Sequence, residues 1–370
     1  MSSVRRVLLV QPMEGSRWRS ITAYAASLAR MLRDTRIEVA MAEAPWSNPP
    51  SIATGLQRRW WRAVEVEAAL RGEFDLVHLT DHALAHHVGR FRGRVPVVVT
   101  CHDLMQMHLP GYYATARERW LKQAFLRRPI AALGRADGVV AVSEYTRGEL
   151  VRRFGSGFEA SVVPNVVRPA FRPVDRQEAE ARLLRAGVEL PPGPRILSVG
   201  NDRAYKNLEA LFEAMGQPAL AHASLVRVGP LTARQRALAE SLGVLRRTAS
   251  LPAVDDEGLA AIYAVCDVLA QPSLGEGFGI PVIEAMACGL PVVVSDGGAL
   301  PEVVGEAGIV VPLAGEGFAR RFGRALVEAS GLREELGAAG LARAEAFRPA
   351  VVAPLLLAAY EHAAGRGRLS

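Results

Sequence analysis

Short apolar runs alternate with amphipathic stretches along this chain, and the runs are rich in β-branched residues. The runs lie at residues 6–11, 37–42, 75–79, 95–100, 136–142, 196–199, 225–229, 249–254, 268–271 and 292–294. Between them, apolar residues recur at helical spacing at residues 20–33, 56–71, 117–133, 144–154, 256–266, 281–288 and 347–362. Strands that alternate with helices in this way are typical of an α/β fold with parallel sheets covered on both faces.

Length and proline spacing divide the chain in two. A chain of 370 residues suits two domains of ordinary size. Prolines at 169 and 173, and the Pro-Pro-Gly-Pro run at 191–194, flank a charged helix and mark a linker. We therefore predict a first domain at residues 1–170 and a second at 171–350.

Residues 269–313 combine a strand, a glycine-rich loop, a helix and a second strand. Gly275, Gly277 and Gly279 give a backbone that can turn sharply and present bare N–H groups, and Pro281 suits the first turn of a helix. Free N–H groups at a helix N-terminus hold anions. The pattern predicts a phosphate site.

Glu276 lies inside this loop, and Glu284 follows eight residues later in the helix. Carboxylates accept hydrogen bonds from hydroxyl pairs, and a nucleotide sugar offers such pairs on both of its sugars. Taken singly, Glu276 could be a loop-surface acid and Glu284 a first-turn acid that the helix dipole favours. Together with the glycines and the following Pro-Val-Val-Val strand, the two glutamates favour a nucleotide-sugar site.

The segment EGFGIPVIEAMACGLPVV, residues 276–293, resembles the E-x7-E signature of the retaining glycosyltransferases of family 4, also called glycosyl transferases group 1. The resemblance implies the GT-B fold, in which two Rossmann-like doubly wound domains face a central cleft. It further implies that residues 1–170 bind the acceptor, that residues 171–350 bind a nucleoside-diphosphate sugar, and that a C-terminal helix at about 351–370 packs back on the first domain.

The resemblance also assigns roles in the donor site. It implies that Glu284 binds the ribose hydroxyls, that Glu276 contacts the transferred sugar, and that Lys206 and Arg203 grip the diphosphate. The family often has an arginine where Asn201 stands here, two residues before Arg203. Further donor contacts are implied at Gly200, Asn201, Gly277, Phe278, Gly279 and Ile280, and at Leu251 and Pro252 for the base.

Two candidate sites lie in the first half. The family has a His-Asp pair after a strand, and His102 matches its histidine, which contacts the donor sugar; a histidine that only caps a loop is the alternative. The first loop carries a glycine pair in the family, but only Gly15 is present here, so Gly15, Ser16 and Arg17 are candidates for acceptor binding. Arg17 could equally be a solvated loop residue.

Charge is uneven along the chain. Residues 1–170 carry 24 Lys and Arg against 15 Asp and Glu, a net of +9, and the remainder carries 20 against 23, a net of −3, which gives the +6 of the whole. An anionic membrane surface, a phosphorylated acceptor, or only the arginine-rich surface of a bacterium with a GC-rich genome would each fit. We expect no nucleic-acid partner, because no nucleic-acid-binding motif is present. The basic helix at 117–133, with Trp120, could lie in a membrane interface or simply pack on the sheet.

Three scattered cysteines, Cys101, Cys266 and Cys288, suit neither a disulfide framework nor a metal site. The first apolar run is too short for a signal peptide. We therefore expect a cytoplasmic protein, with peripheral contact to the inner face of the membrane as an open alternative. We expect neither a cofactor nor a metal; the nucleotide sugar is the donor substrate.

The sequence thus predicts transfer of a hexose, with retention of configuration, from a UDP- or GDP-sugar to an unidentified acceptor hydroxyl. A sugar-nucleotide epimerase or phosphorylase, and a non-catalytic nucleotide-sugar binding module, are alternatives with the same architecture. An oxidoreductase is disfavoured, because no G-x-G-x-x-G motif follows the first strand.

Overall fold

A computed structural model describes residues 4–12, 19–44, 71, 73–109, 112–113 and 115–367 of the chain. It divides into two compact units. The first comprises residues 1–108, 115–166 and 349–370, and the second residues 109–114 and 167–348. The sequence places its domain boundary at residues 170 and 171, four residues beyond the change of unit at 166 and 167.

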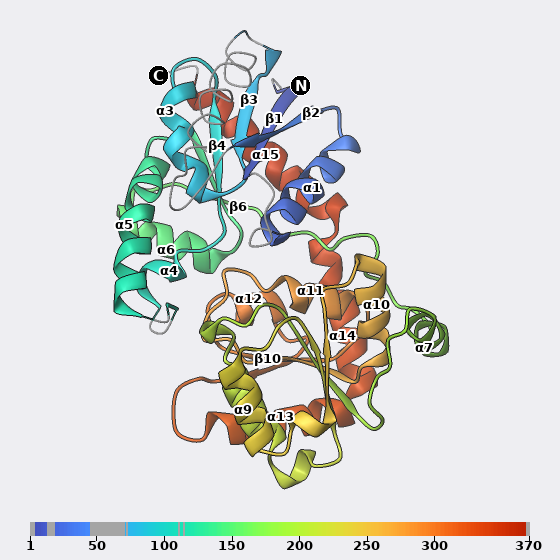
Figure 1. Cartoon of the computed structure of the whole chain (residues 1–370). Coiled ribbons are helices and arrows are strands. Elements are labelled where there is room, and N and C mark those ends of the chain that lie inside the picture. Colours follow the sequence, from blue (N-terminus) through green and yellow to red (C-terminus); the bar gives the residue numbers. More distant parts are fainter. Residues whose placement is uncertain are drawn as a thin grey trace. The chain divides into compact units, whose positions relative to one another are not determined.

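The first unit is built on a parallel sheet whose strands run in the order β2-β1-β3-β4-β5-β6 (Figure 1). The strands are β1 (Arg6–Pro12), β2 (Glu38–Ala44), β3 (Leu76–Leu79), β4 (Val97–Cys101), β5 (Gly138–Ala141) and β6 (Ser161–Val162). The helices are α1 (Arg19–Arg33), η2 (His82–His87), α3 (Val88–Phe91), α4 (Met105–His108), α5 (Ala116–Leu133), α6 (Glu144–Phe154) and α15 (Pro349–Gly367).

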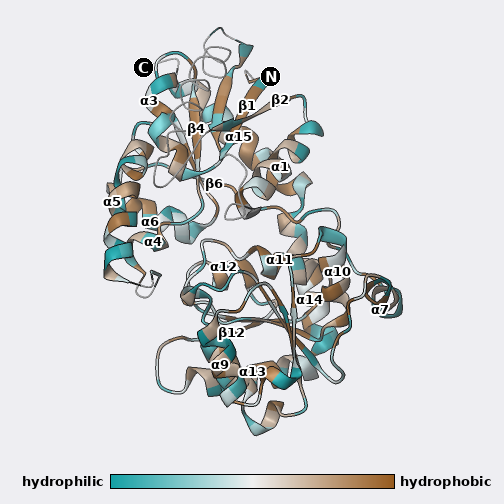
Figure 2. Ribbon diagram, in the orientation of Figure 1, coloured by the Kyte–Doolittle hydropathy of each residue, from teal (hydrophilic) through white to brown (hydrophobic). Residues whose placement is uncertain are grey.

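Both faces of this sheet are buried, as the strand pattern requires. Along β4, Val97 and Val99 pack into one apolar cluster and Val98 into another, because successive side chains of a strand point to opposite faces. The first cluster includes residues of α5, such as Ile130, and the second includes residues of α15. Figure 2 shows the apolar colour along the strands. The sheet is therefore doubly wound.

A buried hydrogen-bond network ties α15 to the sheet. His78 Nδ1 lies 2.8 Å from the Tyr360 hydroxyl, and its Nε2 lies 2.8 Å from Thr100 Oγ1. The Tyr24 hydroxyl, on α1, lies 3.0 Å from the same Thr100 oxygen. Burial lowers the pKa of His78 to about 3, so its imidazole is neutral and can both donate and accept in this network.

The second unit repeats the architecture, with the strand order β12-β11-β10-β7-β8-β9. Its strands are β7 (Arg195–Val199), β8 (Ser224–Val228), β9 (Thr248–Leu251), β10 (Val268–Gln271), β11 (Val292–Ser295) and β12 (Ile309–Val311). Its helices are α7 (Arg176–Arg185), η3 (Ala204–Lys206), α8 (Leu208–Met215), η4 (Pro218–Leu220), α9 (Ala233–Ser241), η5 (Leu245–Arg247), α10 (Asp256–Val265), α11 (Ile280–Ala287), α12 (Leu300–Val304), α13 (Phe318–Gly331), α14 (Arg333–Ala344) and η6 (Glu345–Phe347).

The order of these strands creates a switch point. From β7 the chain moves to β8 and β9 on one side, and then returns to β10, β11 and β12 on the other. β7 and β10 are therefore neighbours whose following loops diverge. In open parallel sheets, ligands bind at the carboxyl ends of the strands at such a point.

Most predicted element boundaries agree with the structure within a few residues. Ser143 caps α6 and accepts a hydrogen bond from the Thr146 N–H, and Pro281 stands in the first turn of α11. The strand β9, at Thr248–Leu251, overlaps the start of the apolar run at 249–254. The helix predicted at 56–71 lies almost wholly outside the described residues.

His78 makes the stability of the folded chain sensitive to acid. Its pKa is about 3 when folded against about 6.5 in an unfolded chain, so the stability that it contributes is present above pH 6.5 and is lost as the pH falls toward 3. When the pH is lowered from 7.5 to 5.0, the free energy of unfolding measured with guanidinium should fall by about 2 kcal/mol more in the wild type than in His78→Gln. His222→Gln, at an exposed histidine, should follow the wild type. An equal loss in wild type and His78→Gln would contradict this account.

Candidate functional site

The predicted donor residues gather at one edge of the second sheet. Lys206 follows β7, Pro252 follows β9, and Glu276 follows β10. The carboxyl ends of parallel strands meet at the same edge. The candidate site is therefore the carboxyl edge of this sheet, centred on the switch point between β7 and β10.

Lys206 and Glu276 meet directly across that switch point. Lys206 Nζ lies 2.7 Å from Glu276 Oε1, and the two side chains are 11% and 9% exposed. Gln271 Nε2 and Ser273 Oγ each lie 2.7 Å from the same oxygen. Burial alone lowers the pKa of Lys206, but the Glu276 carboxylate more than offsets this, so the pKa stands above its ordinary value. Three donors thus converge on Oε1, while Oε2 has no donor among the described residues.

Lys206 does not open a helix. It ends the short turn η3, and α8 begins at Leu208 after Asn207, whose φ is 54°. In the structure the Glu276 carboxylate, 70 residues away, balances the lysine charge. The dipole of α8 therefore gives no reason to expect a bound anion beside Lys206.

The glycine-rich loop is shaped by close backbone approaches. Of its three glycines, only Gly279 has a positive φ, 104°, where it forms the N-terminal boundary of α11. No side chain caps that helix end. Gly298, after β11, has a φ of 72°, and a Cβ there would lie 2.3 Å from the Glu276 carbonyl oxygen. The backbone around Glu276 is fixed by this contact.

Glu284, on α11, is nearly inaccessible at 3% exposure and has two protein donors. Its Oε1 accepts from Arg168 Nη2 at 2.5 Å, and its Oε2 accepts from the Tyr263 hydroxyl at 3.1 Å. Burial raises its pKa, and Arg168 and Tyr263 act in the opposite direction. Arg168 also pairs with Asp256. No sequence signal pointed to Arg168 or Tyr263.

A second arginine that sequence reasoning missed supports the loop after β7. Arg227, on β8, is 1% exposed. Its Nη2 donates to the carbonyls of Gly200 and Asn201, each at 2.7 Å, and its Nη1 donates to Ser198 Oγ at 3.1 Å. Burial lowers its pKa to about 10, so it is still cationic at neutral pH. Two of the predicted donor residues, Gly200 and Asn201, are thereby held by a buried cation.

The other predicted donor residues line the same edge. Arg203 is exposed, and its guanidinium lies 5.8 Å from the ring centre of Tyr112. Leu251 ends β9, and its carbonyl accepts from the Gly229 N–H at 2.9 Å. Phe278 is buried, with its ring edge-on to Phe347. Gly277 and Ile280 complete the loop on either side of Phe278 and Gly279.

In the first unit, His102 follows β4. Its Nε2 lies 2.9 Å from the Thr80 carbonyl oxygen, and its ring meets Tyr24 edge-on at 4.7 Å. Burial lowers its pKa. Because a carbonyl can only accept, Nε2 carries the proton and Nδ1 is left as an acceptor. His102 is thus a neutral acceptor at the carboxyl edge of the first sheet. Gly15, Ser16 and Arg17 lie outside the described residues.

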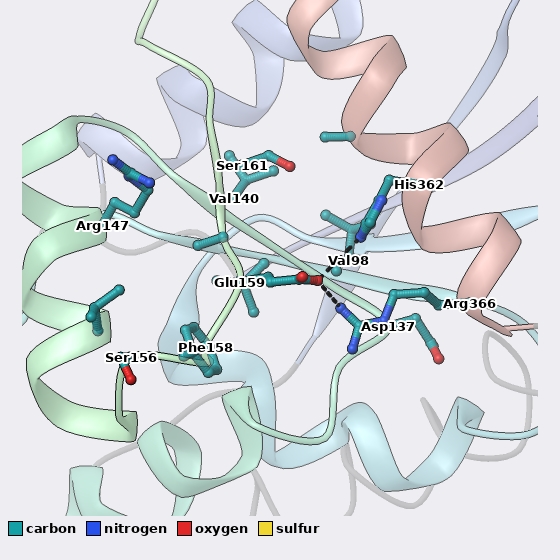
Figure 3. A pocket seen from close by; sticks show the side chains of 15 residues that line it. Val98, Asp137, Val140, Arg147, Ser156, Phe158, Glu159, Ser161, His362 and Arg366 are labelled. Carbon is teal, nitrogen blue, oxygen red and sulfur yellow. Dashed lines mark hydrogen bonds and ion pairs between the residues drawn. The ribbon is translucent and has the colours of Figure 1, made fainter.

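A hollow of about 380 Å³ lies elsewhere in the first unit, near the start of β5 and β6 (Figure 3). Glu159 points between Arg366, at 2.7 Å, and His362, at 3.6 Å. None of the predicted site residues lines it. The hollow therefore does not belong to the candidate site.

The described part of the chain has neither a metal-ligand cluster nor a membrane-spanning helix. No three His, Cys, Asp or Glu side chains gather there as metal ligands would. Within the same residues, no helix has the length and the apolar character that a membrane span needs.

Comparison with known families supports the resemblance. The family described as Glycosyltransferase Family 4 matches residues 21–171, and Glycosyl transferases group 1 matches residues 193–328. A D-inositol 3-phosphate glycosyltransferase of Streptomyces bingchenggensis is 33% identical over 244 residues, which are 59% of this chain and 50% of that protein. The chain spans about half the length of the curated relatives it matches.

Solved structures share the fold over nearly the whole chain. Sucrose-phosphate synthase from Thermosynechococcus elongatus has a TM-score of 0.72 at 22% identity, covering 95% of this chain and 97% of that one. Anabaena HepE in complex with UDP-glucose has a TM-score of 0.71 at 18% identity, covering 95% and 98%. These similarities establish the α/β GT-B architecture with two domains.

The pairing of Lys206 with Glu276 should dominate the stability of this edge. Removing one partner of a buried ion pair costs about 3–5 kcal/mol, because the other charge is left unpaired. Lys206→Met and Glu276→Leu should each lower the free energy of unfolding in guanidinium denaturation. The loss in the double variant should be smaller than the sum of the two single losses by about 2 kcal/mol or more.

The half-exposed pair of Arg182 and Glu257, 3.1 Å apart, provides the matched control. The same double-mutant cycle there should give a coupling below about 1 kcal/mol. Additive losses at Lys206 and Glu276 would show that the pair contributes no coupling.

Proposed function

We propose that this chain, which belongs to the GT-B glycosyltransferases of family 4 (group 1), transfers a hexose from a nucleoside-diphosphate sugar to an acceptor hydroxyl with retention of configuration. The observation that carries the proposal is the meeting of Lys206 and Glu276 at the switch point of the second sheet. UDP-glucose bound to Anabaena HepE, a structural neighbour, supports a nucleotide-sugar donor, with UDP- or GDP-sugars as the candidates.

The charges at the carboxyl edge suit the two ends of such a donor. Lys206, Arg203 and the uncapped start of α11 would stabilise the diphosphate as negative charge builds on it during bond cleavage. Glu276 Oε2, which has no donor among the described residues, would accept from hydroxyls of the transferred sugar. His102 would accept a further sugar hydroxyl through Nδ1. Catalysis by these groups is positional and electrostatic.

This arrangement assigns charge compensation to side chains and a helix end. We therefore propose that transfer needs no divalent metal. The acceptor is unidentified, and its binding is assigned to the first unit, including the loop with Gly15, Ser16 and Arg17.

The donor can be identified by thermal shift against UDP-, GDP-, ADP- and dTDP-sugars. A donor at 100 times its dissociation constant adds about 2.7 kcal/mol of stability, a shift of a few degrees. We expect one class of nucleotide sugar to stabilise the wild type, and Lys206→Ala and Glu284→Ala to lose the effect. Millimolar EDTA should leave it unchanged. Stabilisation by none of the donors would count against the proposal.

The stabilising donor, labelled in its sugar, then tests the reaction with fractionated cell extract as the source of acceptor. Transfer with retention gives a labelled product whose anomeric proton coupling matches that of the donor. A changed sugar without any acceptor would indicate an epimerase instead. Consumption that depends on inorganic phosphate would indicate a phosphorylase, and binding without turnover a non-catalytic module. Loss of transfer in EDTA would contradict metal independence.

We further propose that the protein is cytoplasmic and contacts an anionic membrane surface through α5. The inner side of α5 packs Leu126, Ile130 and Leu133 into the core. Trp120 and Leu121 are nevertheless 68% and 50% exposed. Exposed Arg117, Arg119, Arg127 and Arg128 lie on the same helix. An aromatic and an aliphatic side chain among arginines suit an anionic interface.

Sedimentation with vesicles tests this contact. The wild type should bind vesicles with 30 mol% phosphatidylglycerol about ten-fold more strongly than neutral phosphatidylcholine vesicles, and less so in high salt. Trp120→Ser with Leu121→Ser should abolish most binding. The matched control changes Val351 and Leu355, exposed apolar residues on α15 at 52% and 45%, and should bind as the wild type does. Equal binding by both double variants would exclude α5 as the contact.

A further inference from the structure

Arg168 pairs with Glu284, and the proposed chemistry gives it no role. It lies on the segment that opens the second unit, two residues after position 166. Its Nη2 contacts Glu284 Oε1 at 2.5 Å, its Nη1 contacts Asp256 Oδ1, and its guanidinium carbon lies 4.8 Å from the ring centre of Phe171. Three contacts thus fix the guanidinium in one place.

These contacts matter because Glu284 is a buried carboxylate. A carboxylate at 3% exposure is costly to ionise unless a cation lies beside it. Within the described residues, Arg168 is the cation that pairs with it. Asp256 and the Phe171 ring hold that cation from its other sides, and the planar guanidinium can contact two carboxylates at once.

The Glu284 oxygens keep hydrogen-bond capacity for a ligand. Each carboxylate oxygen can accept at least two hydrogen bonds. Oε1 receives one from Arg168 and Oε2 receives one from Tyr263. Each oxygen therefore keeps at least one acceptor direction, which matches the two neighbouring hydroxyls of a ribose.

We propose that Arg168 is a positioning residue for the donor ribose, which keeps the Glu284 carboxylate ionised and turned so that both oxygens accept from the ribose hydroxyls. This inference rests on the proposed function, since it presumes a nucleotide donor. It adds a residue that lies outside the E-x7-E segment. It also explains the placement of Asp256, whose carboxylate anchors the guanidinium.

Nucleotides that differ by one hydroxyl isolate this role. Calorimetric titrations would use UDP, GDP and their 2′-deoxy counterparts on the full chain. One hydrogen bond to a charged group corresponds to about 10-fold or more in affinity. The wild type should therefore prefer the ribonucleotide by about 10-fold, and Arg168→Met should reduce this preference to about 2-fold or less. Arg168→Lys, which can still supply one cationic contact, should fall between them.

Arg182→Met is the matched control, because Arg182 pairs with Glu257, the neighbour of Asp256 on α10. It should keep the wild-type preference. Circular dichroism and thermal unfolding would check that each variant is folded. If the role of Arg168 were merely structural, Arg168→Met would weaken the binding of both nucleotides of a pair equally. The preference would then be unchanged, and this result would overturn the inference.

The wild-type titrations separate this inference from the donor proposal. If the wild type binds neither UDP nor GDP, the donor proposal fails and the role of Arg168 falls with it. If the wild type binds and prefers the ribonucleotide, but Arg168→Met prefers it equally, only the role of Arg168 is wrong.

Discussion

The ion pair between Lys206 and Glu276 is the contact on which the second unit's carboxyl edge depends. It spans the switch point between β7 and β10, from which the chain continues to opposite sides of the sheet. Both charges are largely withdrawn from water, so each needs the other until a ligand arrives. A donor would supply negative charge for the lysine and hydroxyl donors for the glutamate. Under the proposed function, the same pair stabilises this edge and holds both charges where a donor would meet them.

Buried cations recur around this edge with distinct tasks. Arg227 holds backbone carbonyls of the loop after β7, and Arg168 holds the carboxylate of Glu284. Arg227 is buried and Arg168 is mostly buried, and each donates to oxygen acceptors from other parts of the second unit. In a low-dielectric setting such contacts fix loop geometry more firmly than exposed pairs can. The proposed diphosphate and ribose contacts are thus supported by side chains that need not touch the donor.

The first unit uses buried polar groups in a different way. His78, Thr100, Tyr24 and Tyr360 connect the sheet to helices from both ends of the chain. Their neutrality avoids the cost of buried charge, since the imidazole and hydroxyls can satisfy one another. Tyr24 then meets the ring of His102. The orientation of a candidate sugar-binding histidine therefore depends on a network that also anchors α15.

The sequence alone determined the architecture and much of the candidate site. Continuous apolar runs, helical spacing and the glycines before Pro281 are local features, so the pattern of residues predicts them directly. The spacing of Glu276 and Glu284 on one loop and helix is also local, and it carried the resemblance to the family. The roles of Lys206 and His102 were implied by the same resemblance.

The tertiary structure decided which charges are partners, because pairing depends on strand order and not on sequence distance. Glu276 lies 70 residues from Lys206 and Glu284 lies 116 residues from Arg168, and no local pattern relates either pair. The resemblance implied a diphosphate beside Lys206, and the fold places the Glu276 carboxylate there. Arg227 and Arg168 read as ordinary arginines in an arginine-rich chain, and only their burial against specific oxygens reveals what they hold in place.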